Sequence, residues 1–358
     1  MDFLPQLLVN MPVVSSNLAK MCEKARVLSI PMRPHVKTLN DPVIANVLKL
    51  QGITRICVSN MAMFRQFLDA GWRDICLAVT CPLAYIAELN QCLKTYDDLI
   101  ITLYVDDMSQ LLALQRVDGP FHINIEIDTG QYRTGVPWRH ERQFISMIDT
   151  IKHSPHVFSG LTTHFGQLYD CELADDISSE FSKLMMKVLQ LKGHLSDHFS
   201  EDVFLAIGDT PSCTYNDYFE QINEIRAGNF LFNDLMIHQK GLCQWSDLAC
   251  VVEAQVISKS ADDCRFVLHC GSVHLSKEKL NHPSIQFGMV AVMEDGWIKA
   301  PLNGVCIDRL YQEHAVVIGP TDIVQTIDIG QTLGVLPVHA CLAMDAMWHK
   351  QQVRCIPE

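Results

Sequence analysis

Three features are missing from this chain of 358 residues: a C-x-x-C pair, a long apolar run and a surplus of basic residues. Without C-x-x-C, neither a zinc ribbon nor a thioredoxin-like redox site is expected. No uninterrupted apolar stretch reaches the roughly 18 residues that a membrane span needs. The net charge is −13, and a general nucleic-acid binder needs a basic footprint instead. Neither nucleic acid nor membrane is therefore an expected partner.

The composition is that of a folded, globular protein. Hydrophobic residues make up 48% of the chain and charged residues 19%, which excludes intrinsic disorder. The length corresponds to roughly two domains. The N-terminal residues MDFLPQLLVNMPVV carry no basic leader, and fourteen cysteines without a secretion signal indicate free thiols. We therefore expect a cytoplasmic protein.

Short β-rich runs alternate with helix-like segments over the first 235 residues. The runs are 27–30, 54–59, 74–79, 99–105, 121–127, 157–163, 203–208 and 224–232. The helical segments are 41–51, 60–71, 83–94, 108–115, 138–153, 173–199 and 211–222. Apolar strands alternating with helices indicate parallel βαβ units, and eight of them predict a TIM barrel. An open doubly wound sheet is the alternative.

The pattern changes after a boundary near residue 235. The segments 250–258, 264–269, 287–293 and 314–318 are β-rich, and the spacers between them are too short for crossover helices. This pattern predicts a mostly antiparallel β domain.

The residues GDTPSC, 208–213, come directly before a predicted helix, after the seventh predicted strand. Backbone N–H groups at a helix N-terminus bind anions, and barrel enzymes often hold phosphate after strands seven and eight. The same residues also make an ordinary N-cap followed by proline in the first turn. The nearby Gly228–Asn229 loop keeps both interpretations open.

Two basic residues follow predicted strands at the barrel mouth. Lys37, in RPHVKT, lies where a lysine can lose its proton and serve as a Schiff-base amine; a salt-bridged surface lysine is the alternative. Arg133 follows a glycine-containing turn and can hold an anionic ligand group or bridge to Asp128.

Three further residues have weaker signals. His164 follows the sixth predicted strand, where a hydrogen-bonded core histidine is the simpler interpretation. His339 and Cys341 are one residue apart, so on a strand they would share a face and could chelate a metal ion. A buried thiol is the alternative for Cys341.

Several motifs, in order along the chain, resemble those of fold-type III pyridoxal-phosphate enzymes, and among these the D-threonine aldolase and D-serine dehydratase family. They are RPHVKT (33–38), EIDTGQYRTGV (126–136), GDTPSC (208–213), EIRAGNFLFND (224–234), QEHA (312–315) and PVHAC (337–341). The resemblance implies an alanine-racemase-like barrel over 12–235 and a β domain made of 1–11 plus 236–358. It also implies a head-to-tail homodimer with shared active sites.

The same resemblance implies pyridoxal 5′-phosphate as cofactor, with Lys37 as its Schiff-base lysine and His164 as a second catalytic residue. The other residues that it implies in cofactor binding are His35, Arg133, Gly208, Asp209, Thr210, Ser212, Arg226, Gly228 and Asn229. It also implies a metal ion on His339 and Cys341. A thiolate ligand favours Zn²⁺ over Mn²⁺ or Mg²⁺.

The histidine–cysteine pair resembles that of the family's D-serine dehydratases, whereas its D-threonine aldolases have His-x-Asp. We therefore expect conversion of D-serine to pyruvate and ammonia. His164 and Gln167 stand where the family often has Tyr and His, and His274 where many relatives have Lys. A D-threonine aldolase and a racemase with Tyr311 as second base are thus alternatives. Two alternatives belong to other functional classes: a non-catalytic cofactor-binding protein and a sugar-phosphate barrel enzyme.

Overall fold

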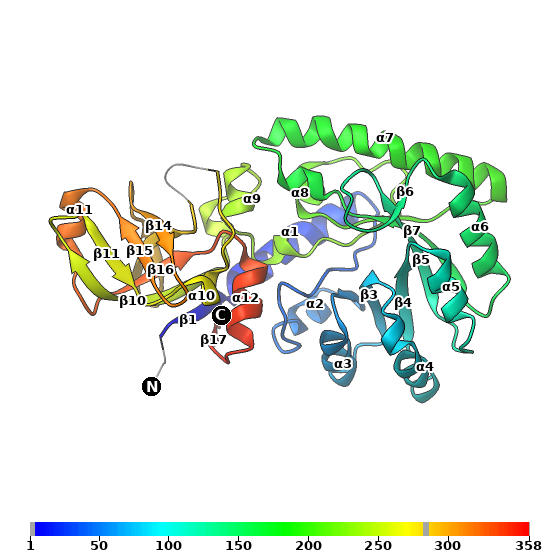
Figure 1. The fold of residues 1–358 in the computed structure, drawn as a ribbon, viewed down its shortest axis with the longest axis horizontal. Helices are drawn as coiled ribbons and strands as arrows, with labels where there is room; N and C mark the ends of the chain where they lie inside the picture. The colour runs from blue at the N-terminus through cyan, green and yellow to red at the C-terminus, as the bar shows by residue number, and fades with distance from the viewer. Residues whose placement is uncertain (1–3, 282–285, 358) are drawn as a thin grey trace. The chain divides into compact units, whose positions relative to one another are not determined.

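The computed structural model describes residues 4–281 and 286–357, and the chain forms two compact units (Figure 1). Unit 1 comprises Met1–Leu18, Thr38–Asn40 and Asn229–Glu358. Unit 2 comprises Ala19–Lys37 and Asp41–Gly228. In the part of the chain that is described, no helix is long and apolar enough to cross a membrane.

Unit 2 is built on a parallel sheet with the strand order β2-β3-β4-β5-β7-β8-β9, and β6 pairs with β5. The strands are β2 (Arg55–Val58), β3 (Asp74–Thr80), β4 (Ile100–Val105), β5 (His122–Asp128), β6 (Val136–Pro137), β7 (Val157–Thr163), β8 (Leu205–Ile207) and β9 (Glu224–Ile225). Isolated parallel bridges Met32–Ile225 and His35–Cys57 join the segment 32–35 to β9 and β2. This segment closes the barrel, so the predicted TIM barrel is confirmed and the open doubly wound sheet is wrong.

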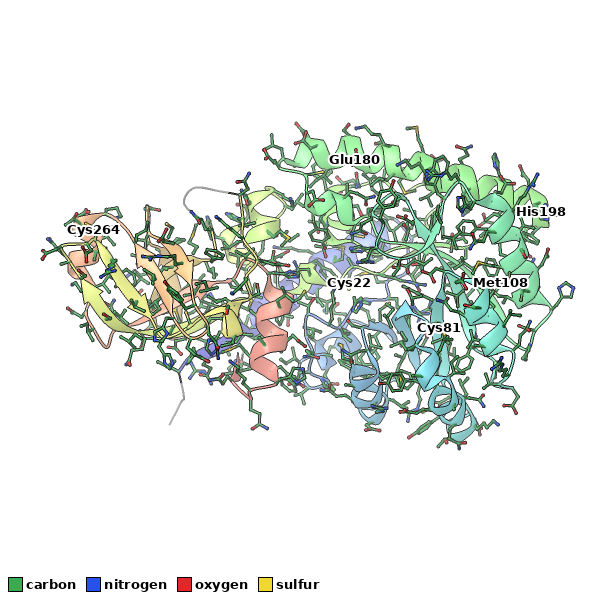
Figure 2. All side chains as sticks on the ribbon, in the orientation of Figure 1. Cys22, Cys81, Met108, Glu180, His198 and Cys264 are labelled. Carbon is green, nitrogen blue, oxygen red and sulfur yellow. The ribbon has the colours of Figure 1, made fainter. Side chains whose placement is uncertain are left out.

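Helices lie between the strands of unit 2. They are α1 (Met11–Val27, which begins in unit 1), α2 (Asn46–Leu50), α3 (Met61–Asp69), η1 (Leu83–Tyr85), α4 (Ile86–Thr95), α5 (Met108–Leu114), α6 (Glu141–Lys152), η2 (Gly166–Tyr169), α7 (Ala174–Phe199) and α8 (Thr210–Tyr215). Local chemistry sets where they begin: the Asn60 side chain accepts the Met63 N–H at the start of α3. The longest is α7, of 26 residues, and Glu180 and His198 lie near its opposite ends (Figure 2).

Three boundaries differ from the sequence prediction. The strand predicted at 27–30 is wrong, because α1 continues to Val27 and a turn with Ser29 at φ 55° follows. The eighth strand ends at Ile225, and Asn229–Leu231 forms the 3-10 helix η3. The helix predicted at 211–222 ends at Tyr215. Apolar runs predicted the order of elements, but turns within those runs interrupt the regular structure.

Unit 1 contains a nine-stranded, mostly antiparallel sheet, which confirms the predicted β-rich part. Its strands are β1 (Gln6–Asn10), β10 (Cys250–Ser260), β11 (Arg265–Leu268), β12 (Met289–Glu294), β13 (Trp297–Pro301), β14 (Cys306–Leu310), β15 (Ala315–Ile318), β16 (Thr332–Leu336) and β17 (Val353–Ile356). The N-terminal β1 pairs antiparallel with β10 and parallel with β17. Short helices complete the unit: α9 (Leu235–Gln239), η4 (Trp245–Asp247), α10 (Ser272–Leu275), α11 (Thr321–Thr326) and α12 (Ala340–Trp348).

The barrel interior holds a buried ion cluster around Glu224. Its carboxylate accepts hydrogen bonds from Arg226 at 2.6 Å and from Arg33 and Arg55 at 3.2 Å each. Arg33 also binds Asp74, the first residue of β3, at 2.6 Å. Arg33 therefore points toward the N-terminal ends of the strands, away from the barrel mouth where Lys37 is expected.

Candidate active site

Lys37 lies two residues after the segment 32–35, and its side chain is exposed. Its backbone N–H donates to Nδ1 of His35 at 3.3 Å, so the proton of a neutral His35 ring is on Nε2. Burial, together with the positive charge of Lys37, lowers the pKa of His35 well below 6.5. His35 is therefore neutral at physiological pH, beside the predicted Schiff-base lysine.

His164 lies in the same electrostatic environment, directly after β7. Burial and the charges of Arg133 and Lys37 lower its pKa to about 3. Nδ1 lies 3.1 Å from the carbonyl oxygen of Gly208, which can only accept, so Nδ1 carries the proton. The ring is stacked on Tyr169, with centroids 6.1 Å apart. His164 is thus a neutral ring with an unprotonated Nε2.

The arginine motif is held together by two carboxylates with different tasks. Asp128 Oδ1 accepts the backbone N–H groups of residues 130, 131 and 132, at 2.8, 2.9 and 3.1 Å. Arg133 Nη2 instead lies 3.8 Å from Oε1 of Glu126, so the predicted alternative of a bridge to Asp128 is wrong. Burial raises the pKa of Glu126, despite a hydrogen bond with Thr134 and the charge of Arg133. Glu126 was not singled out in the sequence.

The GDTPSC segment forms the predicted helix cap. Asp209 accepts the Ser212 N–H at 2.7 Å and the Ser212 hydroxyl at 2.7 Å, at the start of α8. The Thr210 N–H donates to the hydroxyl oxygen of Tyr169 at 3.3 Å. These bonds engage the Ser212 hydroxyl and the Thr210 amide within the protein. The phosphate-binding role of this loop stays a prediction.

Arg226 is held rigidly inside the barrel. Its Nε donates to Glu224 at 2.6 Å, and its Nη1 donates to the hydroxyl oxygen of Tyr104 at 2.7 Å. Only 4% of Arg226 and 8% of Tyr104 are exposed, so neither moves freely. Glu224 and Tyr104 hold Arg226 in place. Glu224 lies within the same motif, two residues from Arg226, but the sequence alone does not indicate its role, and Tyr104 is 122 residues away.

Two glycines and a buried hydroxyl are compatible with the predicted cofactor site, whose residues stay a prediction. A Cβ on Gly228 would lie 2.4 Å from the His35 carbonyl oxygen, and one on Gly208 would lie 3.5 Å from the Arg226 Cβ. The bare backbones of Gly208 and Gly228 thus lie close to predicted cofactor residues. Among the described residues, Ser59 Oγ and Gln167 Oε1 are buried without a hydrogen-bond partner. The Ser59 hydroxyl can donate to an anionic group, whereas Gln167 Oε1 can only accept a hydrogen bond.

His339 and Cys341 lie at the start of α12, not on a strand as predicted. Helical geometry still brings the pair together: the thiol is hydrogen-bonded to the imidazole, and Glu278 Oε2 lies 2.7 Å from His339 Nδ1. Burial lowers the pKa of His339, but these two hydrogen bonds outweigh it and raise the pKa to about 10. Cys341 also contacts the Thr38 hydroxyl at 3.1 Å.

Asp234 connects this pair to the end of the EIRAGNFLFND motif. Its Oδ2 accepts the Ala340 N–H at 3.0 Å and the Asn229 side-chain amide at 2.8 Å. Asn229 in turn accepts from the Cys341 thiol at 3.6 Å. The Asn229 side chain is therefore engaged beside Cys341, and its predicted role in phosphate binding would fall to its backbone N–H.

The imidazole and thiol suit a zinc ion, which prefers nitrogen and sulfur ligands. Within residues 4–281 and 286–357, no group of three or more His, Cys, Asp or Glu side chains is arranged to hold a metal ion. The pair would therefore supply two protein ligands, one fewer than the three of a typical catalytic zinc site, and the metal site stays a prediction.

The remaining candidates, Tyr311 and His274, lie at or beside α10, and their roles stay predictions. Tyr311 is 54% exposed, and its backbone oxygen accepts the Ser272 N–H at 2.8 Å. Nδ1 of His274 accepts the Gly271 N–H at 3.1 Å, and its Nε2 lies 3.6 Å from Glu313. His274 is thus a capping residue of α10, which explains why a histidine is tolerated at this position.

Sequence comparison identifies both parts of the chain. Residues 9–235 match the alanine racemase N-terminal domain, and residues 249–352 match a putative serine dehydratase domain. The chain belongs to the alanine racemase N-terminal domain family of fold-type III pyridoxal-phosphate enzymes. Its curated relatives are dehydratases and an aldolase, and it is a pyridoxal-phosphate-dependent lyase.

Three such relatives span nearly the whole chain. D-threo-3-hydroxyaspartate dehydratase of Delftia sp. (strain HT23) is 25% identical over 94% of this chain and 90% of its own length. D-serine dehydratase of Dictyostelium discoideum is 24% identical over 96% and 92%. D-threonine aldolase of Arthrobacter sp. is 24% identical over 94% and 85%.

The fold agrees with these relatives. The solved Delftia dehydratase superimposes with a TM-score of 0.87 at 23% identity, over 96% of this chain and 92% of that one. A cysteine-to-alanine variant of the same enzyme, solved in the metal-free form, has the same TM-score, identity and coverage.

Proposed function

We propose that this lyase acts on D-β-hydroxy amino acids, with a metal ion on His339 and Cys341, and that it dehydrates D-serine to pyruvate and ammonia. The observation that carries the proposal is the contact between the Cys341 thiol and the His339 imidazole. A thiolate ligand favours zinc. The dehydratases among the relatives, and the metal-free cysteine variant of one of them, support this assignment.

Lys37 would hold pyridoxal phosphate through its ε-amine, and Arg226 would face the pyridine nitrogen. When bound, this group stabilises negative charge at the substrate Cα. The hydrogen bonds from Arg226 to Glu224 and Tyr104 keep the guanidinium in one place, so it would meet the bound cofactor in a fixed orientation. Arg133, with Glu126 behind it, would face the phenolic oxygen.

Proton transfer falls to Lys37, because the other candidate is a poor base. The ε-amine of Lys37 would take the Cα proton on one face of the substrate. The pKa of His164, about 3, means that its Nε2 accepts hydrogen bonds but does not retain a proton at neutral pH. His164 therefore orients its neighbours rather than acting as the general base expected of a second catalytic residue.

The metal would supply Lewis-acid polarisation of the β-hydroxyl, which makes hydroxide a better leaving group. Loss of water from D-serine, followed by tautomerisation and hydrolysis of the released enamine, would give pyruvate and ammonia. D-threo-3-hydroxyaspartate, the substrate named for the Delftia relative, carries the same leaving group and is the natural comparison.

The test is an absorption spectrum of the purified protein, followed by addition of D-serine, D-threonine, D-threo-3-hydroxyaspartate and the L-isomers, each with and without a chelator. We expect a visible band from lysine-bound cofactor and formation of pyruvate from D-serine, which the chelator stops. Glycine and an aldehyde as products would contradict the dehydratase assignment. Absence of the band after addition of cofactor would contradict the cofactor assignment.

The head-to-tail homodimer belongs to the same proposal. It is supported by the family resemblance alone, and light scattering of the cofactor-loaded protein measures it directly. A monomer with full activity would contradict the shared active sites.

A further inference from the structure

The carboxylate of Glu278 contacts one ring nitrogen of His339, the histidine of the proposed metal site. Glu278 Oε2 lies 2.7 Å from Nδ1 of His339. A separation of 2.7 Å is that of a direct hydrogen bond and leaves no room for a metal ion between the two atoms. If His339 binds a metal ion, the ligand atom must be its other ring nitrogen, Nε2.

The segment CGSVHLSKE, residues 270–278, is built to deliver Glu278 to this position. A Cβ on Gly271 would lie 2.2 Å from the Gln312 carbonyl oxygen, so the segment starts in close backbone contact. The His274 ring caps α10, which packs against α12. At the end of α10, Ser276 adopts φ 78°, and its hydroxyl accepts the Glu278 N–H at 3.2 Å. Each contact fixes the backbone that carries the glutamate.

We propose that Glu278 is the residue that orients His339 for metal binding: its carboxylate accepts the Nδ1 proton and leaves Nε2 as the metal ligand. Metal-binding histidines commonly donate their second N–H to a carboxylate, which sets the tautomer and makes the ligand nitrogen more basic. The side chain of Glu278 is 42% exposed and that of His339 is 23% exposed. An exposed ion pair of this kind contributes little to folding, so the pair is better explained by orientation of the ligand.

This inference rests on the metal site of the proposed function. Glu278 is a positioning residue, since its carboxylate touches the histidine and not the metal. Its loss should weaken metal binding but leave the protein ligands of the metal unchanged. Loss of such a partner typically weakens metal binding by about 10- to 100-fold.

The experiment measures zinc affinity of the full-length, cofactor-loaded protein by competition with a chromophoric chelator. The variants are Glu278→Ala, Glu278→Gln and Cys341→Ala. The matched control is Glu141→Gln, because Glu141 Oε2 lies 2.9 Å from Nδ1 of His194 on other helices. We expect about 10- to 100-fold weaker zinc binding for Glu278→Ala, a smaller loss for Glu278→Gln, which keeps an acceptor oxygen, and no change for Glu141→Gln. Thermal unfolding of the metal-free Glu278 variants and of Glu141→Gln should be the same as that of the wild type.

Zinc affinity of Glu278→Ala equal to that of the wild type, while Cys341→Ala loses zinc, would overturn the role of Glu278 and leave the proposed metal site intact. Failure of the wild type to bind zinc would overturn both. X-ray absorption of the zinc-loaded proteins separates orientation from direct ligation. We expect the same nitrogen and sulfur ligands in Glu278→Gln as in the wild type, and loss of an oxygen ligand would overturn the proposal.

Discussion

Arg226 donates a hydrogen bond from Nη1 to the hydroxyl oxygen of Tyr104 at 2.7 Å, across 122 residues of sequence. Tyr104 lies in β4 and Arg226 directly follows β9, two strands that are not neighbours in the sheet. The bond therefore crosses the barrel interior. Tyr104 binds the guanidinium through Nη1 while Glu224 binds it through Nε, so two protein groups fix its position.

Tyr104→Phe should weaken both folding and cofactor binding. It removes one buried hydrogen bond to a charged group, for which we expect a loss of about 1.5–3 kcal/mol in the free energy of unfolding. Urea denaturation and titration with pyridoxal phosphate measure the two effects. Tyr218→Phe, at a residue that is 70% exposed, is the control and should change neither. Unaltered cofactor affinity in Tyr104→Phe would show that the Tyr104–Arg226 hydrogen bond does not contribute to cofactor binding.

Glu224→Gln should lower stability in a pH-dependent way. Burial raises the pKa of Glu224, but the charges of Arg226 and Arg33 outweigh it and hold the pKa below its ordinary 4.5. The unfolded chain therefore binds the proton more tightly, so this contribution is complete above pH 4.5 and is lost as the pH falls through the folded-state pKa.

Above pH 4.5 we expect Glu224→Gln to lose about 3–5 kcal/mol in the free energy of unfolding, because three arginines lose a charged partner. The difference from wild type should shrink in more acidic solution. Denaturant titrations from pH 7 to pH 3 measure it. Glu180→Gln, in an exposed pair with Lys183, is the control, with a change of at most about 1 kcal/mol. A difference that is constant with pH would refute the electrostatic explanation.

Lys37→Ala should abolish the visible band of lysine-bound cofactor, because no amine remains to bind its aldehyde carbon. Lyase activity should be lost with the band. Lys183→Ala on α7, whose side chain is 60% exposed, is the control and should keep both. A band that persists in Lys37→Ala would place the cofactor on another lysine.

Cys341→Ala should remove zinc and D-serine dehydration while the cofactor band stays. Metal analysis, absorbance and pyruvate formation follow the three properties separately. Cys264→Ala is a matched control (Figure 2). Cys264 lies between β10 and β11, and its thiol is hydrogen-bonded to the Thr321 hydroxyl at 3.0 Å. Full activity of Cys341→Ala after complete loss of zinc would show that the metal has no catalytic role.

Gly228→Ala should disturb the cofactor site, because its Cβ would lie 2.4 Å from the His35 carbonyl oxygen and 2.9 Å from the His35 Cβ. Overpacking of this kind costs about 1–3 kcal/mol and would shift the segment that carries Lys37. Gly193→Ala is the opposite case: it lies within α7 with no atom inside 4 Å, and a gain of about 0.5–1 kcal/mol is expected. Thermal unfolding and cofactor titration of both variants test the contrast.

Local patterns in the sequence predicted much of the architecture. Seven of the eight predicted barrel strands overlap β2, β3, β4, β5, β7, β8 and β9, because buried parallel strands are continuous apolar runs. The first strand segment lies at 32–35 and not at the predicted 27–30, because the apolar residues of 27–30 belong to the end of α1 and to a turn. In the β-rich part, β13, β14, β16 and β17 were not predicted.

Only part of the candidate site could be predicted from the sequence. Residue chemistry and position indicate roles for Lys37 and Arg133, and the family resemblance implies one for Arg226. The residues that hold the two arginines, Glu126 and Tyr104, were not predicted, because a carboxylate or tyrosine on a strand has no distinctive spacing. The structure also decided between interpretations: it pairs Arg133 with Glu126 rather than Asp128, and it places His339 and Cys341 at a helix start.

The sequence by itself determined the alternation of strands and helices and the change to a β-rich second part, and it supplied the candidate reactive side chains. These depend on periodicity and residue chemistry, which are local properties. Only the tertiary structure decided the partners of those side chains: Glu278 reaches His339 across 61 residues, and Tyr104 reaches Arg226 across 122. Such pairs follow from the packing of distant elements, so burial and geometry, rather than spacing along the chain, assign each reactive group its partner.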